Sequence, residues 1–286
     1  MAKIVAVHGI SQEYRGRHTI RAEWLPQLKD GLERAGWALE SDDDFDCAFY
    51  GDIFRKEAKA IGIPDYNKYD IETDWERSLL LALWTEVSKV EPDIAGPNEA
   101  STEKGFVTDL AQKALRALSR SRYFGSAAEK FVIHWLKQVG GYLHDPNLRR
   151  QIRDRVVESI SDDTRVLIGH SLGSIVSYEV LCEHPEWPVE AFVSLGSPLG
   201  IRTLIFDRLD PAPKDGVGHW PGSVTHWVNI ADKDDVVALE KQLDPLFQET
   251  VVDWPIDNGI AAFAHDGGRY LTAKQTGEAI KLGLGL

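Results

Sequence analysis

Apolar runs and amphipathic segments take turns along most of the chain. Residues 4–7, Ile-Val-Ala-Val, form an unbroken apolar run, which is typical of a strand buried on both faces of a parallel sheet. Other short apolar runs follow along the chain, and segments with apolar residues at helical spacing lie between them. The strands that the pattern predicts lie at 4–7, 46–54, 165–168, 191–195, 226–230 and 250–254, and the helices at 24–36, 147–160, 175–181 and 272–282. Repeated strand and helix units of this kind predict an α/β fold, with a mostly parallel sheet covered by helices on both faces.

The alternation stops between residues 56 and 146, where the pattern is mainly helical and too long for one crossover between strands. Helices are expected there at 73–90, 103–120 and 126–139. We therefore divide the chain into a core of residues 1–55 and 147–286 and a helical insertion of residues 56–146 that forms a cap.

One apolar side of the insertion, within residues 124–143, includes Phe124, Phe131 and Trp135. Two interpretations stay open. The stripe lines a hydrophobic lid over an acyl-binding cleft, in which case Phe131 and Trp135 bind substrate, or it packs the helical insertion against the core. An apolar stripe at helical spacing fits both.

The sequence Gly-His-Ser-Leu-Gly at residues 169–173 lies between an expected strand and an expected helix. A Gly-x-Ser-x-Gly motif in this setting is a nucleophile elbow, in which a tight turn strains the backbone of the serine and exposes its hydroxyl group. The helix that begins there points its first N–H groups toward the serine, where they can stabilise an oxyanion. Ser171 is therefore the candidate nucleophile. An ordinary glycine-rich turn with a bystander serine is the alternative.

A serine nucleophile needs a histidine to accept its proton and a carboxylate to orient that histidine. In folds with a nucleophile elbow of this type, the acid and then the histidine follow the serine along the chain. The histidines that do so are His184, His219, His226 and His265. We expect His265 to be the base, because it lies in a loop after the last expected strand, whereas the other three lie in turns or at the opposite edge of the sheet.

Three aspartates follow the strand that ends near residue 230. A carboxylate that holds a histidine has to be anchored and partly buried, which favours Asp235 because Val236 and Val237 follow it. Asp232 is the alternative acid, and Asp234 comes third. The aspartates that are not used for catalysis are expected to be solvated or to cap a helix.

The first expected strand ends in Val-His-Gly-Ile, residues 7–10. In a fold with a nucleophile elbow, the loop after such a strand supplies one oxyanion donor, and the residue after the nucleophile supplies the other. The backbone N–H groups of Ile10 and Leu172 are therefore the expected donors. Gly9 allows the close approach of the loop. We expect His8 to order this loop by hydrogen bonding rather than to act as the base.

Composition restricts the classes of partner. The 286 residues include 45 acidic and 32 basic side chains and carry a formal net charge of −13, which disfavours nucleic acids and anionic membranes as partners held by charge. The two cysteines, Cys47 and Cys182, suggest neither a disulfide framework nor a zinc site. Neither a secretory leader nor an apolar run of about 18 residues stands out, so we expect a cytoplasmic protein without stable membrane insertion.

A family resemblance is carried by residues 7–10, 169–173, 196–198 (Gly-Ser-Pro), 231–238 and His265. Together they resemble the α/β-hydrolase superfamily, and within it they look most similar to intracellular bacterial lipase- and esterase-like proteins related to the GPI inositol-deacylase group. The resemblance covers about residues 1–55 and 147–286. It implies an α/β-hydrolase fold and cleavage of a carboxylic ester through an acyl-enzyme, without a metal or an organic cofactor. The chain differs from simpler members in its large insertion and its aspartate-rich loop.

The expected function is therefore that of a serine ester hydrolase that acts on a small-molecule or lipid-derived acyl ester. Two other classes stay open: a non-catalytic or partner-regulated binding or signalling protein on the same fold, and an acyltransferase or peptidase with the same triad. Reaction with a fluorophosphonate probe would separate an active serine enzyme from a protein that only kept the fold.

Overall fold

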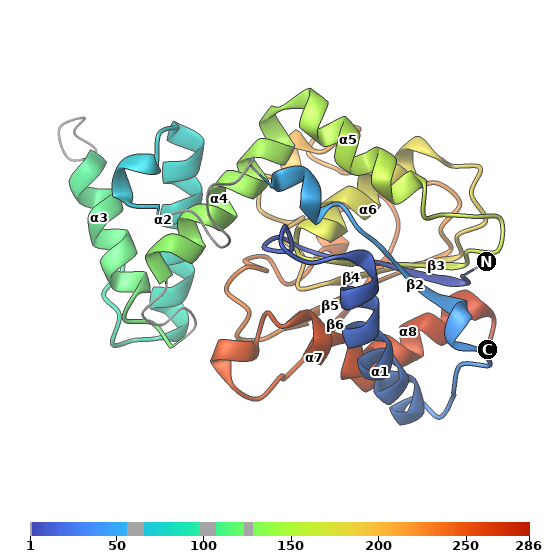
Figure 1. Ribbon diagram of the computed structural model, residues 1–286. Coiled ribbons are helices and arrows are strands. Elements are labelled where there is room, and N and C mark those ends of the chain that lie inside the picture. Colours follow the sequence, from blue (N-terminus) through green and yellow to red (C-terminus); the bar gives the residue numbers. More distant parts are fainter. Residues whose placement is uncertain (1, 56–65, 98–106, 123–127) are drawn as a thin grey trace.

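The computed structural model describes residues 2–55, 66–97, 107–122 and 128–286, and its centre is a six-stranded sheet (Figure 1). The strands are β1 (Ile4–Val7), β2 (Phe45–Ala48), β3 (Val166–His170), β4 (Ala191–Leu195), β5 (His226–Asp232) and β6 (Val251–Ile256). Their order across the sheet is β2-β1-β3-β4-β5-β6, and every neighbouring pair is parallel. The predicted α/β fold with a parallel sheet is therefore confirmed.

Helices cover both faces of the sheet. One face carries α1 (Arg17–Arg34), α7 (Gly267–Thr272) and α8 (Lys274–Leu284), and the other carries α5 (Pro146–Val157) and α6 (Leu172–Glu183) (Figure 1). Side chains of β1 alternate between the faces: Ile4 and Ala6 pack in the apolar cluster of α1 and α8, whereas Val5 and Val7 pack in the cluster that contains α5 and α6. All four are fully buried, which explains the unbroken apolar run in the sequence.

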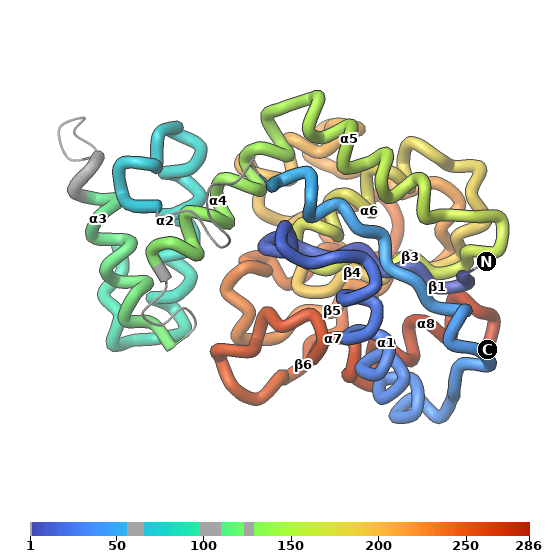
Figure 2. Tube along the Cα trace, in the orientation of Figure 1, coloured from blue at the N-terminus to red at the C-terminus, as the bar shows by residue number. Residues whose placement is uncertain are grey.

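The insertion forms a helical lobe beside the core. The lobe consists of α2 (Asp74–Val90), α3 (Val107–Leu118) and α4 (Ala128–His144), so the three helices expected in this part of the sequence are present (Figure 1). Helix α4 runs from the lobe to the core (Figure 2), where Asp145 caps the start of α5 through the N–H groups of Asn147 and Leu148. Trp75 Nε1 in α2 donates to Leu204 O at 2.8 Å and so joins the lobe to the core.

Several element boundaries differ from the sequence expectation, and three differences change the description of an element. Helix α1 begins at Arg17 rather than at residue 24: residues 17–19 are exposed, and Ile20 continues the buried face one helical turn before Trp24. Strand β2 ends at Ala48 rather than at residue 54, because Tyr50 leaves the extended conformation and a 3₁₀ turn follows. The last helical segment is two helices, since Ala273 between α7 and α8 is extended, with φ −68° and ψ 138°.

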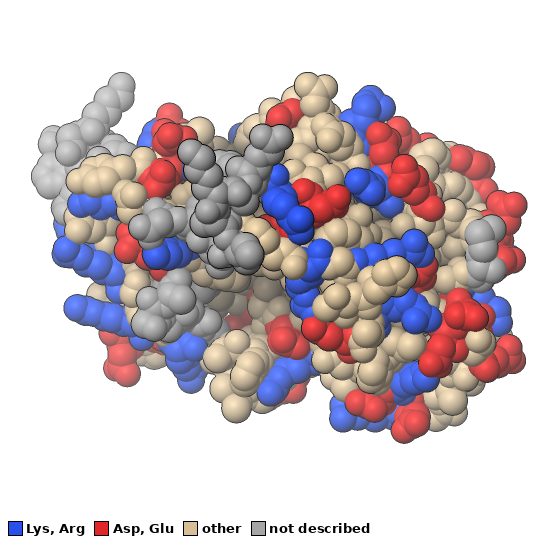
Figure 3. Space-filling view, viewed as in Figure 1, with Lys and Arg blue, Asp and Glu red and all other residues tan. Residues whose placement is uncertain are grey.

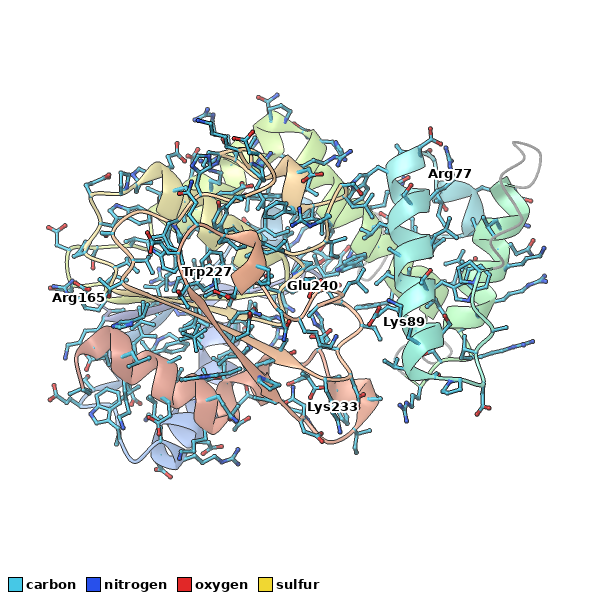
Figure 4. The ribbon with its side chains drawn as sticks, turned by 180° about the vertical axis from the view of Figure 1, so that it is seen from behind. Arg77, Lys89, Arg165, Trp227, Lys233 and Glu240 are labelled. Atoms are coloured by element: carbon cyan, nitrogen blue, oxygen red, sulfur yellow. The ribbon has the colours of Figure 1, made fainter. Side chains whose placement is uncertain are left out.

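The carboxyl ends of the strands meet at one edge of the sheet, because the strands are parallel. Figure 4 shows Lys233 and Glu240, which follow β5, at the end of the core nearer the helical lobe, and Arg165, which precedes β3, at the far end. The segments after β1, β3 and β5, in which the sequence predicts the site, therefore lie at the edge that faces the lobe.

Charged side chains of both signs are interspersed over the described part of the face in Figure 3. The mixture of Lys and Arg with Asp and Glu on this face contrasts with the basic stripe that is typical of nucleic-acid binding.

None of the described helices is both long enough and apolar enough to cross a membrane. The cytoplasmic location stays a prediction.

Candidate active site

Ser171 lies between β3 and α6 in a backbone conformation that few residues with a side chain adopt. Its φ is 53° and its ψ is −127°, a region that is strained for any residue other than glycine. Its N–H donates to Leu195 O in β4 at 3.0 Å, and Ser174 Oγ donates to Ser171 O at 2.6 Å. The first bond joins the turn to the neighbouring strand β4, and the second joins it to the first turn of α6. The strained turn between strand and helix agrees with the nucleophile elbow expected from the sequence, but the hydroxyl group is buried rather than exposed.

The loop after β1 lies against Ser171. A Cβ atom at Gly9 would be 2.7 Å from Ser171 Cβ and 3.3 Å from Ser171 Oγ, so the approach requires glycine. Ile10 follows Gly9, and Leu172 is the first residue of α6, where a backbone N–H has no partner within the helix. The backbone segments that carry the two expected oxyanion donors thus adjoin Ser171.

His265 pairs with Asp235, which lies 30 residues earlier in the chain. Its Nδ1 is 2.7 Å from Asp235 Oδ2; the carboxylate is completely buried, and the imidazole side chain is 25% exposed. Because a carboxylate accepts hydrogen bonds, Nδ1 of His265 carries the proton, and Nε2 is left to accept one. A general base beside a serine requires this tautomer.

Four donors hold the carboxylate of Asp235. Its Oδ2 accepts from His265 and, at 2.8 Å, from the hydroxyl group of Tyr270. Its Oδ1 accepts from the N–H groups of Val237 at 2.8 Å and Ala238 at 3.3 Å. Burial would raise the pKa of Asp235, but the charge and hydrogen bond of His265, together with the other donors, outweigh burial and lower that pKa to about 2. The carboxylate therefore stays ionised at neutral pH and can stabilise an imidazolium ion.

Gly196 leaves room for the pair of His265 and Asp235. Its φ of 53° lies in the left-handed region, and a Cβ atom there would be 2.7 Å from Asp235 Oδ2 and 3.1 Å from His265 Nδ1. Gly196 directly follows Leu195, whose carbonyl oxygen accepts from the N–H of Ser171. The end of β4 therefore borders both the serine and the histidine–aspartate pair.

Asp232 is also buried, but its contacts organise the loop. Its Oδ1 accepts from the N–H of Asp234 at 2.7 Å, and its Oδ2 accepts from the N–H of Asn258. Tyr270 links the two buried aspartates, because its hydroxyl group donates to Asp235 and accepts from the N–H of Asp232 at 2.8 Å. The histidine thus pairs with Asp235, the first choice from the sequence, and not with the alternative acid.

Two residues of the site were not identified from the sequence. His170, which is buried next to Ser171, has its Nε2 3.0 Å from the carbonyl oxygen of His265. A signal for His170 existed, since it belongs to the elbow motif itself. Tyr270 lies in a stretch without a motif, and no sequence pattern points from it to Asp235.

His8 orders the loop after β1, as expected. Its Nδ1 is 2.6 Å from Gly9 O and therefore donates, whereas its Nε2 accepts from the N–H of Tyr50 at 3.1 Å. Burial lowers the pKa of His8 to about 4, so the ring is neutral at neutral pH. Two of the histidines that were not expected to be the base lie in other surroundings. His184 Nδ1 is 2.9 Å from Glu186 Oε1, and His226 is exposed at the start of β5.

Ser171 Oγ and His265 Nε2 are both buried without a hydrogen-bond partner among the described residues. Buried polar atoms without partners are uncommon, because each loses its hydrogen bonds to water. Here they are the hydroxyl group of the candidate nucleophile and the free nitrogen of the candidate base. The two atoms are also not hydrogen-bonded to each other, so the contact through which the serine proton would pass to the histidine is not formed in this structure.

The two residues expected to bind substrate lie in α4 of the helical lobe. Trp135 is 2% exposed and Phe131 is half-buried, and both pack in the apolar cluster that also contains side chains of α2 and α5. Packing therefore accounts for Trp135, and contact with a substrate stays a prediction for both residues. Phe124, at the start of the same apolar stripe, lies outside the described residues.

Within the described ranges, no group of three His, Cys, Asp or Glu side chains is arranged to hold a metal ion. No protein-family model matches the chain, and neither a curated protein nor a solved structure matches it. The function has to be inferred from the geometry of the site.

Proposed function

We propose that the chain is a serine ester hydrolase with an α/β-hydrolase fold, in which Ser171 is the nucleophile, His265 the general base and Asp235 the acid that holds it. One observation carries this proposal. Ser171 has a strained backbone and a hydroxyl group that has no hydrogen-bond partner among the described residues. It lies at the same sheet edge as His265, whose Nδ1 is bonded to a buried carboxylate so that its Nε2 can accept a proton. Acyl transfer by serine needs this combination of groups.

In the first half-reaction, Ser171 Oγ attacks the carbonyl carbon of the ester while its proton passes to His265 Nε2. The carbonyl oxygen becomes an oxyanion, which the N–H groups of Ile10 and Leu172 bind. The tetrahedral intermediate then collapses with cleavage of the bond to the alkoxy oxygen. His265 gives its proton to that oxygen, so an acyl-serine remains and an alcohol leaves.

In the second half-reaction, water attacks the acyl-serine and gives one proton to His265 Nε2. The bond between the acyl carbon and Ser171 Oγ breaks, and the proton on His265 returns to Oγ as the carboxylic acid leaves. Asp235 stays ionised throughout, in accord with its pKa of about 2. The sum is one ester and one water converted to one acid and one alcohol.

We propose a small-molecule or lipid-derived acyl ester as the substrate class. An acyltransferase and a hydrolase with this triad share the acyl-serine and differ in the acceptor that removes the acyl group. Product analysis with an added alcohol or amine distinguishes them, because a hydrolase releases mainly the free acid. A peptide panel tests the third possibility, that the same triad cleaves amides.

A fluorophosphonate probe tests the proposal directly, because it forms a stable bond only with an activated serine. We expect one adduct on the wild-type protein by intact mass and none on Ser171→Ala. Ser177→Ala is the matched control: Ser177 lies in α6, and its Oγ is also buried without a partner in the part of the chain that the structure describes, but it is not at the elbow. This control should be labelled like the wild type.

The same preparation is then assayed with nitrophenyl esters of increasing acyl length, beside phospholipids. Wild-type protein that takes up no probe and hydrolyses no ester would refute the proposed activity and favour a binding or signalling role for the fold. Equal labelling of Ser171→Ala and wild type would move the nucleophile to another residue.

A further inference from the structure

The residue after the expected oxyanion donor has a strained backbone. Ser11 has a φ of 60°, in the left-handed region that residues other than glycine enter at a cost of about 1 kcal/mol or more. Its N–H donates to Gln138 Oε1 in α4 at 2.9 Å. Since this N–H belongs to the peptide unit between Ile10 and Ser11, the bond fixes the chain directly after the N–H of Ile10.

Ser11 and Glu13 determine the orientation of the Gln138 amide, whose Nε2 also lies 3.1 Å from His134 Nε2. The N–H of Ser11 can only donate, so it requires the amide oxygen. The carboxylate of Glu13 can only accept, so it requires the amide nitrogen, which lies 3.2 Å from Glu13 Oε2. Gln138 is 3% exposed and Glu13 is 4% exposed. Neither an ionised carboxylate nor an apolar side chain at position 138 would satisfy both partners.

A second residue of α4 holds the same carboxylate. His134, itself buried, has its Nε2 2.6 Å from Glu13 Oε1. His134 and Gln138 are one helical turn apart, so both reach Glu13 from one face of α4. Burial opposes ionisation of Glu13, but the hydrogen bonds from His134 and Gln138 contribute to outweighing it and lower the pKa of Glu13. The carboxylate is therefore a charged acceptor at neutral pH.

The core holds other atoms of this loop. Gln12 Nε2 donates to Ile10 O at 3.3 Å, and the Arg55 side chain donates to Glu13 O at 3.0 and 2.8 Å. These core contacts bind carbonyl oxygens, whereas the helical lobe binds the N–H of Ser11. The loop that would supply an oxyanion donor is thus shared between the core and the lobe.

We infer that Gln138 is a positioning residue for the oxyanion donor Ile10, so that the helical lobe completes a site whose other parts belong to the core. This inference rests on the proposed function. With α4 in its observed place, the peptide unit after Ile10 is held. If α4 moves away, Ser11 loses its partner and relaxes, and the N–H of Ile10 loses its fixed direction. Donors lower the barrier only when they already point at the developing oxyanion.

The test variant is Gln138→Leu, which removes the hydrogen bonds to Ser11 and Glu13, together with the contact to His134, at similar side-chain size. Gln112→Leu in α3 is the matched control, because Gln112 bonds to Lys68, within the insertion. For Gln138→Leu we expect kcat on a nitrophenyl ester to fall about 10- to 100-fold, with KM within about 2-fold of wild type. The Ki of a trifluoromethyl ketone, whose adduct with Ser171 carries an oxyanion, should rise by a similar factor. The control should keep wild-type values.

A second variant, Gln138→Glu, adds a readout that a loss of packing would not produce. A protonated carboxyl group can accept from Ser11 and donate to Glu13, as the amide does, whereas an ionised one cannot donate. Two adjacent carboxyl groups tend to share one proton, because like charges repel. We therefore expect the kcat of Gln138→Glu, relative to wild type, to be highest near about pH 5 and to fall toward about pH 8.

The outcomes separate the inference from the proposed function. A folded Gln138→Leu protein with wild-type kcat, or with a reduced kcat but an unchanged Ki for the ketone, would overturn the inference. If that variant does not fold, a kcat ratio for Gln138→Glu that is independent of pH would overturn it. Wild-type protein that neither turns over esters nor binds the ketone would instead overturn the proposed function.

Discussion

The imidazole rings of His170 and His265 lie with their centroids 4.8 Å apart and their planes tilted by 37°. His170 Nε2 is 3.0 Å from the carbonyl oxygen of His265, so this nitrogen carries a proton and donates it. Burial, and then the neighbouring His265, lower the pKa of His170 to about 3. The residue before the candidate nucleophile therefore holds the loop of the candidate base and is itself uncharged at neutral pH.

His170→Phe should lower kcat about 10- to 100-fold, because the ring remains but the donor that fixes the His265 backbone is lost. His170→Gln should retain more activity, since its amide nitrogen can donate. Steady-state kinetics on one nitrophenyl ester gives both values. The control is His226→Phe, because His226 is exposed at the start of β5. Equal activity of the Phe and Gln variants would reduce the role of His170 to packing.

Asp235→Asn should cost the most activity among the aspartates after β5, about 10³- to 10⁴-fold in kcat, because an uncharged partner neither stabilises the imidazolium ion nor enforces the tautomer. Asp232→Asn should instead lower the melting temperature, since Asp232 accepts from the N–H groups of Asp234 and Asn258. Kinetics and thermal unfolding are measured on both variants. A larger loss of kcat in Asp232→Asn at unchanged stability would transfer the acid to Asp232.

The parts of the site that carry sequence motifs could be predicted. Ser171 follows from the elbow motif, and His265 follows from its place after the last strand. The apolar residues that follow Asp235 favour it as the acid, and its carboxylate accepts hydrogen bonds from the N–H groups of two of these following residues, Val237 and Ala238. In these cases the residue that the local sequence favours is also the one that the tertiary structure brings to the candidate site.

The supporting contacts could not be predicted, because they join segments far apart in the chain. Tyr270 reaches Asp235 across 35 residues, and Gln138 reaches Ser11 across 127 residues. Neither residue belongs to a periodic pattern or a motif from which its partner could be predicted: Gln138 is a buried glutamine in an amphipathic helix, and Tyr270 lies in a short helix. The early start of α1 is a different case, because Ile20 is buried and lies one helical turn before Trp24, so it continues the apolar face.

Two buried histidines should make stability depend on pH in weak acid. Burial lowers the pKa of His8 to about 4 and that of His170 to about 3, from an ordinary value near 6.5. Between these values the unfolded chain binds a proton that the folded protein does not. The free energy of unfolding should therefore fall as the pH drops below about 6.5, by up to about 1.4 kcal/mol per pH unit for each histidine.

Urea unfolding at about pH 7, 6 and 5 measures this slope. In His170→Gln one titrating group is gone, so the slope should decrease by up to about 1.4 kcal/mol per pH unit. The carboxylate of Asp235 does not interfere in this range: its pKa is lowered, so its contribution is complete above about pH 4 and is lost only in stronger acid. The same slope in wild type and variant would show that His170 binds its proton in the folded state as readily as in the unfolded chain.

The last prediction separates packing from substrate contact in α4. Trp135 is 2% exposed, so Trp135→Ala should destabilise the protein by about 3–5 kcal/mol and lower its melting temperature. Its Nε1 is buried without a partner among the residues that the structure describes. Trp135→Phe should cost less, because it keeps much of the apolar surface and removes the partnerless N–H. Phe131 is half-buried, so Phe131→Ala should change the preference for acyl length more than it changes stability. Thermal unfolding and hydrolysis of esters of increasing length are measured on all three variants. An unchanged length profile in Phe131→Ala, with a large loss of stability, would mean that this stripe of α4 only packs the lobe against the core.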